Sequence, residues 1–189
     1  MKVLALDLSK RSTGWACWNG EAERPIYGHW RLGSEFTTDG AVFAKLHSEM
    51  NALFRVQRYD VIYFEEPIHP AQLSGHTNAK TIRLAAGLAA HVESFAYAVC
   101  CRRVEAINVQ TWRKDFIGRQ SIPKGGKRGD ARNLLKELTI ERCRQLGFTP
   151  QRDDEADAIG ILDYSLGLNG IVPPWRKDEV LRPMLTGAK

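Results

Sequence analysis

The chain has 189 residues, a formal net charge of +5 and a sequence pI near 9.1. This length fits one domain of ordinary size with a single hydrophobic core. No stretch is long and apolar enough to span a bilayer, and the first residues lead into a predicted strand instead of a signal peptide, so we expect a cytoplasmic protein without membrane partners.

The first third of the chain predicts three antiparallel strands. Residues 2–8 form a nearly continuous apolar run, which is typical of a strand buried on both faces, and Asp7 stands at its carboxyl end. After a polar turn, residues 13–18 and 25–32 regain strand character. The Asn-Gly pair at 19–20 is a hairpin signal between them.

The rest of the chain predicts helices alternating with strands. Apolar residues that recur at helical spacing indicate helices, and short apolar runs between them indicate strands. In chain order, we expect a helix at 39–58, a strand at 59–65, a helix at 77–100, a strand at 103–109, a basic loop, and helices at 131–146 and 153–168. A strand–helix–strand crossover makes the fourth and fifth strands parallel. Residues 1–170 therefore form one domain, and 171–189 an irregular tail.

Four carboxylates stand at the ends of these apolar segments: Asp7, Glu65, Asp154 and Asp157. A carboxylate at the end of a buried strand is desolvated and usually has a partner. Residues three apart on a helix share one face, so Asp154 and Asp157 can approach a common site while Glu155 points aside. Mg²⁺ is the natural partner because it takes a few carboxylates and keeps waters free for substrate phosphates.

Neighbouring acids leave alternatives open. Glu65 and Glu66 face opposite ways in a strand, and we favour Glu65 as the site residue. Asp153 is better explained as the N-cap of the last helix, and Asp163 as a structural or surface residue. For Asp157, the alternative role is a buried structural ion pair.

The positive charge is concentrated between residues 113 and 132. This segment holds seven basic and two acidic residues, and its excess of +5 equals that of the whole chain. Glycines and a proline at 122–129 predict a mobile loop rather than a regular element. A flexible basic loop suits a phosphate backbone, although a solvated surface loop has the same composition.

Three motifs together resemble the RuvC-type Holliday junction resolvases. Residues 7–15 (DLSKRSTGW) are similar to the first motif of that family, in which an Asp ends the first strand before a polar turn. Residues 64–67 (FEEP) are similar to the second and residues 154–158 (DEADA) to the last. Each motif is weak alone, but all three stand in the right order on the expected elements, over residues 1–168.

The resemblance implies an RNase H-like fold, a three-layer α/β/α architecture with a central mixed five-stranded sheet. It implies a structure-selective endonuclease that cuts four-way DNA junctions on opposing strands by two-metal-ion hydrolysis. The cofactor would be two Mg²⁺ ions per site, with Mn²⁺ as a substitute, held by Asp7, Glu65, Asp154 and Asp157. The family and the two-fold symmetry of the substrate imply a homodimer.

Further residues are expected to contact branched DNA. They are basic or polar residues near the motifs or in the basic segment, together with an aliphatic wedge and one tryptophan: Lys10, Arg11, Ile68, His76, Asn78, Lys80, Arg83, Trp112, Arg113, Lys114, Arg119, Lys124, Lys127 and Arg128. Ile68 stands where the family uses an aromatic or bulky side chain to enter the junction, and an aliphatic wedge can also unstack bases.

Other functions fit parts of the pattern. A nickase of branched DNA, or a DNA-binding module that retains the fold without catalysis, would show much of the same sequence. The turn after Asp7 also resembles the phosphate loop of actin-like ATPases and sugar kinases, but those proteins need a second lobe that 189 residues cannot supply.

Overall fold

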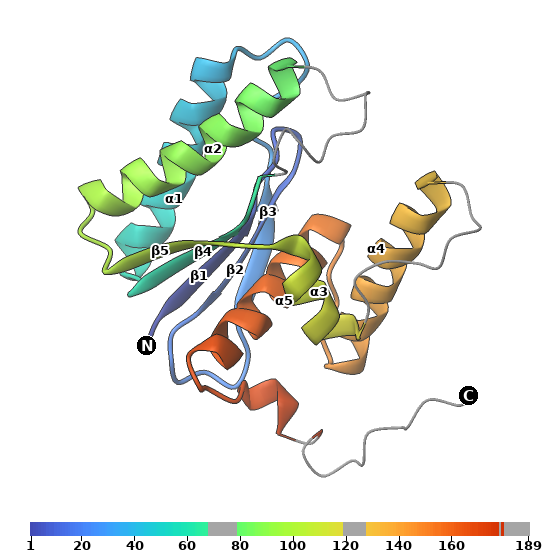
Figure 1. The fold of residues 1–189 in the computed structure, drawn as a ribbon. Coiled ribbons are helices and arrows are strands. Elements are labelled where there is room, and N and C mark those ends of the chain that lie inside the picture. The colour runs from blue at the N-terminus through green and yellow to red at the C-terminus, as the bar shows by residue number, and fades with distance from the viewer. Residues whose placement is uncertain (68–78, 119–127, 178, 180–189) are drawn as a thin grey trace.

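The chain folds into a mixed five-stranded sheet with helices on both faces, the three-layer architecture predicted from the sequence (Figure 1). This computed structural model describes residues 1–67, 79–118, 128–177 and 179, and the side chains of 128–132 lie outside the description. The strands are β1 (Val3–Asp7), β2 (Thr13–Trp18), β3 (Ile26–Trp30), β4 (Val61–Glu65) and β5 (Arg103–Ile107). The helices are α1 (Asp39–Val56), α2 (Ala79–Ala98), α3 (Val109–Ile117), α4 (Arg128–Gln145), α5 (Asp153–Leu168) and the short 3₁₀ helix η2 (Pro174–Arg176).

The strand order is β3-β2-β1-β4-β5. Strands β1, β2 and β3 form an antiparallel meander, whereas β4 pairs parallel with both β1 and β5. The three opening strands and the parallel crossover are therefore confirmed. Because β1, β3, β4 and β5 all run the same way, their carboxyl ends meet at one edge of the sheet.

Alternating strand residues divide the core into two halves. Val3 and Ala5 of β1 belong to the half that packs against α3, α4 and α5, and Leu4 and Leu6 belong to the half beneath α1 and α2 (Figure 1). This period of two is the one expected for strands buried on both faces.

Cross-strand register sets which residues share the carboxyl edge. Asp7 of β1 lies opposite Gly14 of β2, and Gly14 lies opposite His29 of β3. On the other side, Leu6 pairs with Phe64, which places Glu65 beside Asp7. A row of side chains thus runs along this edge on the face that α5 covers.

Helix α3 is the main departure from the predicted elements. The sequence predicts a strand to residue 109 and a loop beyond it, but a helix starts directly after Asn108, whose side chain caps Gln110 N. It ends at Gly118, which has a left-handed φ of 71°. An Asn at the N-cap and a Gly after the last turn are ordinary signals for the start and end of a helix. The prediction missed them because the basic charge of the segment was interpreted as that of a loop.

The hairpin between β2 and β3 is confirmed, and in the loop that joins them the Asn19 side chain accepts the backbone N–H groups of Glu21 and Ala22. One smaller expectation is wrong. Asp153 is not the N-cap of α5, since Arg152 holds that position and Asp153 pairs with Lys136.

The start of the predicted tail packs against the domain. Trp175 lies edge-on to Trp18 at 6.4 Å between ring centroids, and its Nε1 donates to Asp163 at 2.7 Å. None of the helices among the described residues is long and apolar enough to cross a membrane.

Candidate active site

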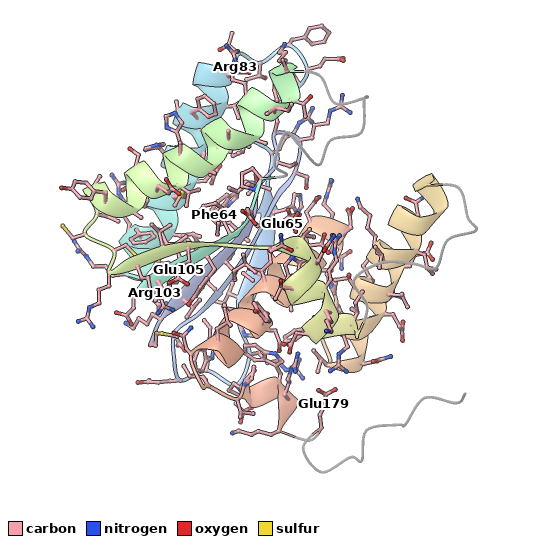
Figure 2. The ribbon with its side chains drawn as sticks, in the orientation of Figure 1. Phe64, Glu65, Arg83, Arg103, Glu105 and Glu179 are labelled. Carbon is pink, nitrogen blue, oxygen red and sulfur yellow. The ribbon has the colours of Figure 1, made fainter. Side chains whose placement is uncertain are left out.

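The four predicted acids come from three elements that meet at the carboxyl edge of the sheet. Asp7 ends β1 and Glu65 ends β4, while Asp154 and Asp157 lie on the first two turns of α5. Asp7 interacts electrostatically with each of the other three, so the fold brings all four acids to the same edge of the sheet. Figure 2 shows Glu65 at the end of β4, next to Phe64, which belongs to the core half under α1 and α2.

Glu65 and Glu66 have different surroundings. Glu65 Oε2 accepts a hydrogen bond from Trp112 Nε1 at 3.1 Å, on the side of the sheet that holds α3 and α5. Glu66 is exposed, and its Oε2 accepts from Asn108 Nδ2 at 3.3 Å. The register therefore places Glu65, the favoured alternative, beside Asp7.

A glycine allows α5 to approach the sheet. A Cβ atom on Gly14 would lie 1.8 Å from the carbonyl oxygen of Asp154, a distance that no side chain tolerates. Because Gly14 also faces Asp7 across the β1–β2 pair, this contact brings the start of α5 directly over the acid row. The glycine of the first motif is needed for this close approach of backbone to backbone.

Helix α3 contributes a cation to the acids. Arg113 Nη2 donates to Asp157 Oδ2 at 3.0 Å, and both side chains are largely buried. The Arg113 guanidinium also lies 4.9 Å from the ring centroid of Trp112. The pair is incompletely satisfied, since Arg113 Nε and Asp157 Oδ1 are buried without a hydrogen-bond partner among the described residues.

Burial and mutual repulsion raise the pKa values of the acids. Burial raises the pKa of Asp7 well above its usual range, and Glu65, Asp157 and Asp154 raise it further. Burial raises the pKa of Asp157 to about 7, although the neighbouring Arg113 opposes the shift. The pKa of Asp154 is raised mainly by burial. Such a cluster holds its charge poorly unless a cation joins it, which is typical of a functional site.

The donor set suits a hard divalent cation. Carboxylate oxygens are the ligands that Mg²⁺ prefers, and Asp157 Oδ1 is a buried acceptor with no described partner. In this conformation, however, no three His, Cys, Asp or Glu side chains in the described part of the chain are grouped closely enough to hold a metal ion. The acids fit an ion in their chemistry, and they would have to draw closer together to bind one.

The predicted DNA contacts have varied outcomes. Six of them, Ile68, His76, Asn78, Arg119, Lys124 and Lys127, lie outside the described residues, as does the side chain of Arg128. Lys80 and Lys114 are exposed, and Arg11 lines a surface cavity. Lys10 donates to the Thr37 carbonyl at 2.6 Å, and Arg83 pairs with Asp39 at 2.6 Å, so both of these cations have partners within the protein.

The expectation that Trp112 contacts DNA is wrong. Its side chain is fully buried between α3 and α5, against Gly160, and its indole N–H is directed to Glu65. The sequence pattern hid this because α3 was predicted as strand and loop. On a helix, Trp112 and Phe116 stand four residues apart on one buried face.

Sequence reasoning missed a second polar contact beside the acids. Glu155 is 5% exposed, and its Oε1 lies 2.7 Å from His29 Nδ1 while its Oε2 accepts from Gln151 N at 2.7 Å. Glu155 therefore does point away from Asp154 and Asp157, but toward a specific partner on β3. Nothing in the local sequence links residues 29 and 155, which only the register of β3 brings together.

Several solved structures have this fold. RuvC of Thermus thermophilus in complex with a Holliday junction substrate aligns with a TM-score of 0.63 and 14% identity, over 90% of this chain and 97% of that chain. The Holliday junction resolvase of Fowlpox virus aligns with a TM-score of 0.51 and 14% identity, over 89% and 99%. The yeast mitochondrial Holliday junction resolvase aligns with a TM-score of 0.52 and 10% identity, over 84% and 76%.

No protein-family model matches the sequence, and a search of curated proteins found no match. The structural likeness, at these low identities, establishes the fold: the chain has the RNase H-like fold of the RuvC-type resolvases, as the three motifs predicted.

Proposed function

We propose that this chain is a Mg²⁺-dependent endonuclease that resolves four-way DNA junctions by cutting opposing strands. The observation that carries the proposal is the gathering of Asp7, Glu65, Asp154 and Asp157 at one edge of an RNase H-like sheet, with raised pKa values for Asp7, Asp154 and Asp157. A fold alone does not identify an activity, so these side chains and the DNA that a structural neighbour binds support the proposal.

The four carboxylates would hold two Mg²⁺ ions. When bound, such a pair supplies an activated water and stabilises the leaving oxygen, so no side-chain nucleophile is needed. The protein's own residues prepare this site: Trp112 fixes one oxygen of Glu65 through its N–H, and Arg113 compensates part of the charge of Asp157. A dead module would have little reason to keep several destabilised carboxylates facing a polyanion.

The substrate assignment rests on charge and on the neighbours. The +5 charge lies in the segment from residue 113 to 132, which starts at the acid site with Arg113. Thermus thermophilus RuvC, with the same fold, is described in complex with a Holliday junction substrate. We place the activity in the cytoplasm, on branched DNA, most specifically on four-way junctions.

A homodimer would place two such sites symmetrically about the two-fold axis of a junction. The outer face of α2 offers a surface with small residues, because Ala86 and Ala90 are exposed. Gly87 and Ala89 do not contribute to it: a Cβ on Gly87 would lie 2.5 Å from Phe43, and Ala89 is 8% exposed.

Cleavage of labelled DNA tests the proposal. The protein should cut a four-way junction with Mg²⁺, faster than a matched fork, flap or duplex, and not with EDTA. Asp7→Asn should bind the junction but not cut it. Equal cutting of all branched substrates would favour a general nickase, and binding without cutting in any divalent cation would favour a non-catalytic module.

A plasmid cruciform tests the dimer. Two sites acting in one binding event should yield linear plasmid with little nicked intermediate, and a mixed dimer of wild type and Asp7→Asn should yield mainly nicked circles. A protein that remains monomeric on junction DNA and produces only nicked circles would contradict the dimeric resolvase.

A further inference from the structure

A basic cavity lies beside the acid site, and only one of its described lining residues, Arg11, belongs to the three motifs. It has a volume of about 400 Å³ and is lined by Arg11, His29, Arg31, Ser34, Glu35 and Arg152. We call this the arginine pocket. Three guanidinium groups and one imidazole face a single carboxylate, so the pocket favours an anion.

Strand register places the arginine pocket close to the acids. His29 is two strands away from Asp7 along the same edge, which at about 4.8 Å between strands is on the order of 10 Å. Arg31 directly follows β3 at this edge, and Arg152 is the N-cap of α5, two residues before Asp154. A strand of duplex DNA advances ~3.4 Å of helix axis per nucleotide and an unpaired strand advances more, so about three nucleotides or fewer cover the gap.

The three arginines are available for a ligand. All three arginines are exposed. In the described part of the chain, none of them forms an ion pair with a carboxylate. His29, in contrast, is held in place by the buried Glu155. An unpaired guanidinium is well suited to phosphate because its planar donors can bind two oxygens at once.

An aromatic side chain projects next to this pocket. Phe36 is 88% exposed and directly follows Glu35, a residue of the pocket lining. The turn that carries it is anchored: Lys10 Nζ donates to Thr37 O at 2.6 Å, Gly33 N donates to Lys10 O at 2.9 Å, and Thr37 N donates to Ser34 O at 3.1 Å. An exposed aromatic on a turn fixed by several hydrogen bonds is presented to solvent rather than packed against the protein.

We propose that the arginine pocket and Phe36 form a binding site for an unpaired DNA segment next to the scissile phosphate. The arginines bind successive phosphates, and Phe36 stacks on a base that branching has released from its pair. Cationic grooves with projecting aromatics are the usual means of holding single strands, because every base has a face on which a ring can stack. This inference rests on the proposed function, since it names the part of the substrate that leads into that active site.

The site accounts for selection of branched DNA. In an intact duplex the bases are stacked on one another, so Phe36 has no free base face on which to stack. A branch point offers unstacked bases, and Phe36 can stack on one of them. Lys10, expected from the sequence to bind DNA, has a different role here, because it holds the turn that carries Phe36.

Binding measurements in the Asp7→Asn background, which prevents cutting, test the site. Phe36→Ala should weaken binding of a fluorescein-labelled four-way junction by about five-fold to a hundred-fold and leave duplex binding unchanged, and Phe36→Trp should restore it. Tyr97→Ala is the matched control, since Tyr97 is 89% exposed at the far end of α2 and should have no effect.

The arginines are tested through salt dependence. Arg31→Gln with Arg152→Gln should flatten the plot of log affinity against log salt by roughly 0.7 unit for each arginine removed. Arg58→Gln with Arg102→Gln removes the same charge from exposed positions next to the amino ends of β4 and β5, and should flatten it less. Glu35→Gln, which removes the only carboxylate among the described lining residues, should tighten binding.

The outcomes separate this inference from the proposed function. If the wild type cuts junctions but the Phe36 and arginine variants bind like their controls, the site is wrong and the nuclease assignment stands. If the wild type cuts no DNA while these variants still lose binding to branched DNA, the site is right and the nuclease assignment fails.

Discussion

Two buried aspartates on α5, Asp157 and Asp163, are each paired with an arginine. Their hydrogen bonding differs, and this difference distinguishes a residue of a functional site from a structural residue. Asp163 has both oxygens satisfied: Oδ1 accepts from Trp175 Nε1 at 2.7 Å and Arg176 Nε at 3.0 Å, and Oδ2 pairs with Arg176 Nη2. Asp157 has one oxygen paired with Arg113 and one buried without a described partner. Burial raises the pKa of both aspartates, and in Asp157 it raises the pKa to about 7.

The comparison shows how the same residue type on one helix serves two purposes. A buried carboxylate with complete hydrogen bonding joins parts of a fold, here α5 and the segment around η2. A buried carboxylate that lacks a hydrogen-bond partner and lies among other acids lowers the stability of the fold, and such an arrangement is typical of a ligand-binding site.

The largest effect is expected on catalysis. Asp157→Asn should lower junction cleavage by roughly a thousand-fold or more, because it removes a charge that would hold the metal ions, while junction binding persists. Asp163→Asn should retain cleavage within about ten-fold at a temperature where it is folded. Single-turnover cleavage in Mg²⁺ measures both, and near-normal cutting by Asp157→Asn would show that its role is only structural.

The converse effect is expected on stability. Asp163→Asn removes one charge partner of the mostly buried Arg176, which keeps the longer 3.3 Å ion pair with Asp115, and breaking a buried ion pair costs about 3–5 kcal/mol of unfolding free energy. Urea denaturation measures this loss. A matched double change, Asp163→Asn with Arg176→Met, should recover part of the loss. An Asp163→Asn variant as stable as wild type would mean that the tail contact contributes nothing.

Mg²⁺ binding should stabilise the folded protein through the acid site, and the Asp163–Arg176 pair should not contribute to this effect. At ten times its Kd, an ion that binds only the folded state adds about 1.4 kcal/mol, which raises Tm by about 3–6 °C for a chain of this size. The shift should disappear in Asp7→Asn and persist in a stability-matched variant of Asp163. A scan of Tm against Mg²⁺ concentration checks this, and an equal shift in Asp7→Asn would place the ion elsewhere.

The smallest effect is a pH dependence in the metal-free protein. Because burial and neighbouring carboxylates raise the folded-state pKa of Asp7 above its unfolded value, the folded state binds the proton more tightly. Its contribution to stability is therefore present at acid pH and is lost as pH rises through the folded pKa. Asp7→Asn should be more stable than wild type at alkaline pH, with the difference vanishing toward pH 4. A constant difference at all pH values would contradict the raised pKa.

Local signals were sufficient where a single segment carries the information. The apolar run before Asp7, the three-residue spacing of Asp154 and Asp157, and the order of helices and strands all predicted elements that the structure contains. The same signals failed for Trp112, because a helix of nine residues inside a basic segment gives only two buried positions from which to read its period.

The sequence by itself determined the strands, the longer helices, the fold and the acids at their ends, because strand alternation, helix periodicity and the cost of burying a carboxylate all act within a few residues. Only the tertiary structure decided what surrounds those acids: Arg113 on Asp157, His29 on Glu155, and Arg31 with Arg152 in the lining of one cavity. The two side-chain contacts join residues 44 and 126 positions apart, and they depend on strand register and on the close approach of α5 at Gly14. Register and helix packing are set by the whole core, so no local pattern of residues records them.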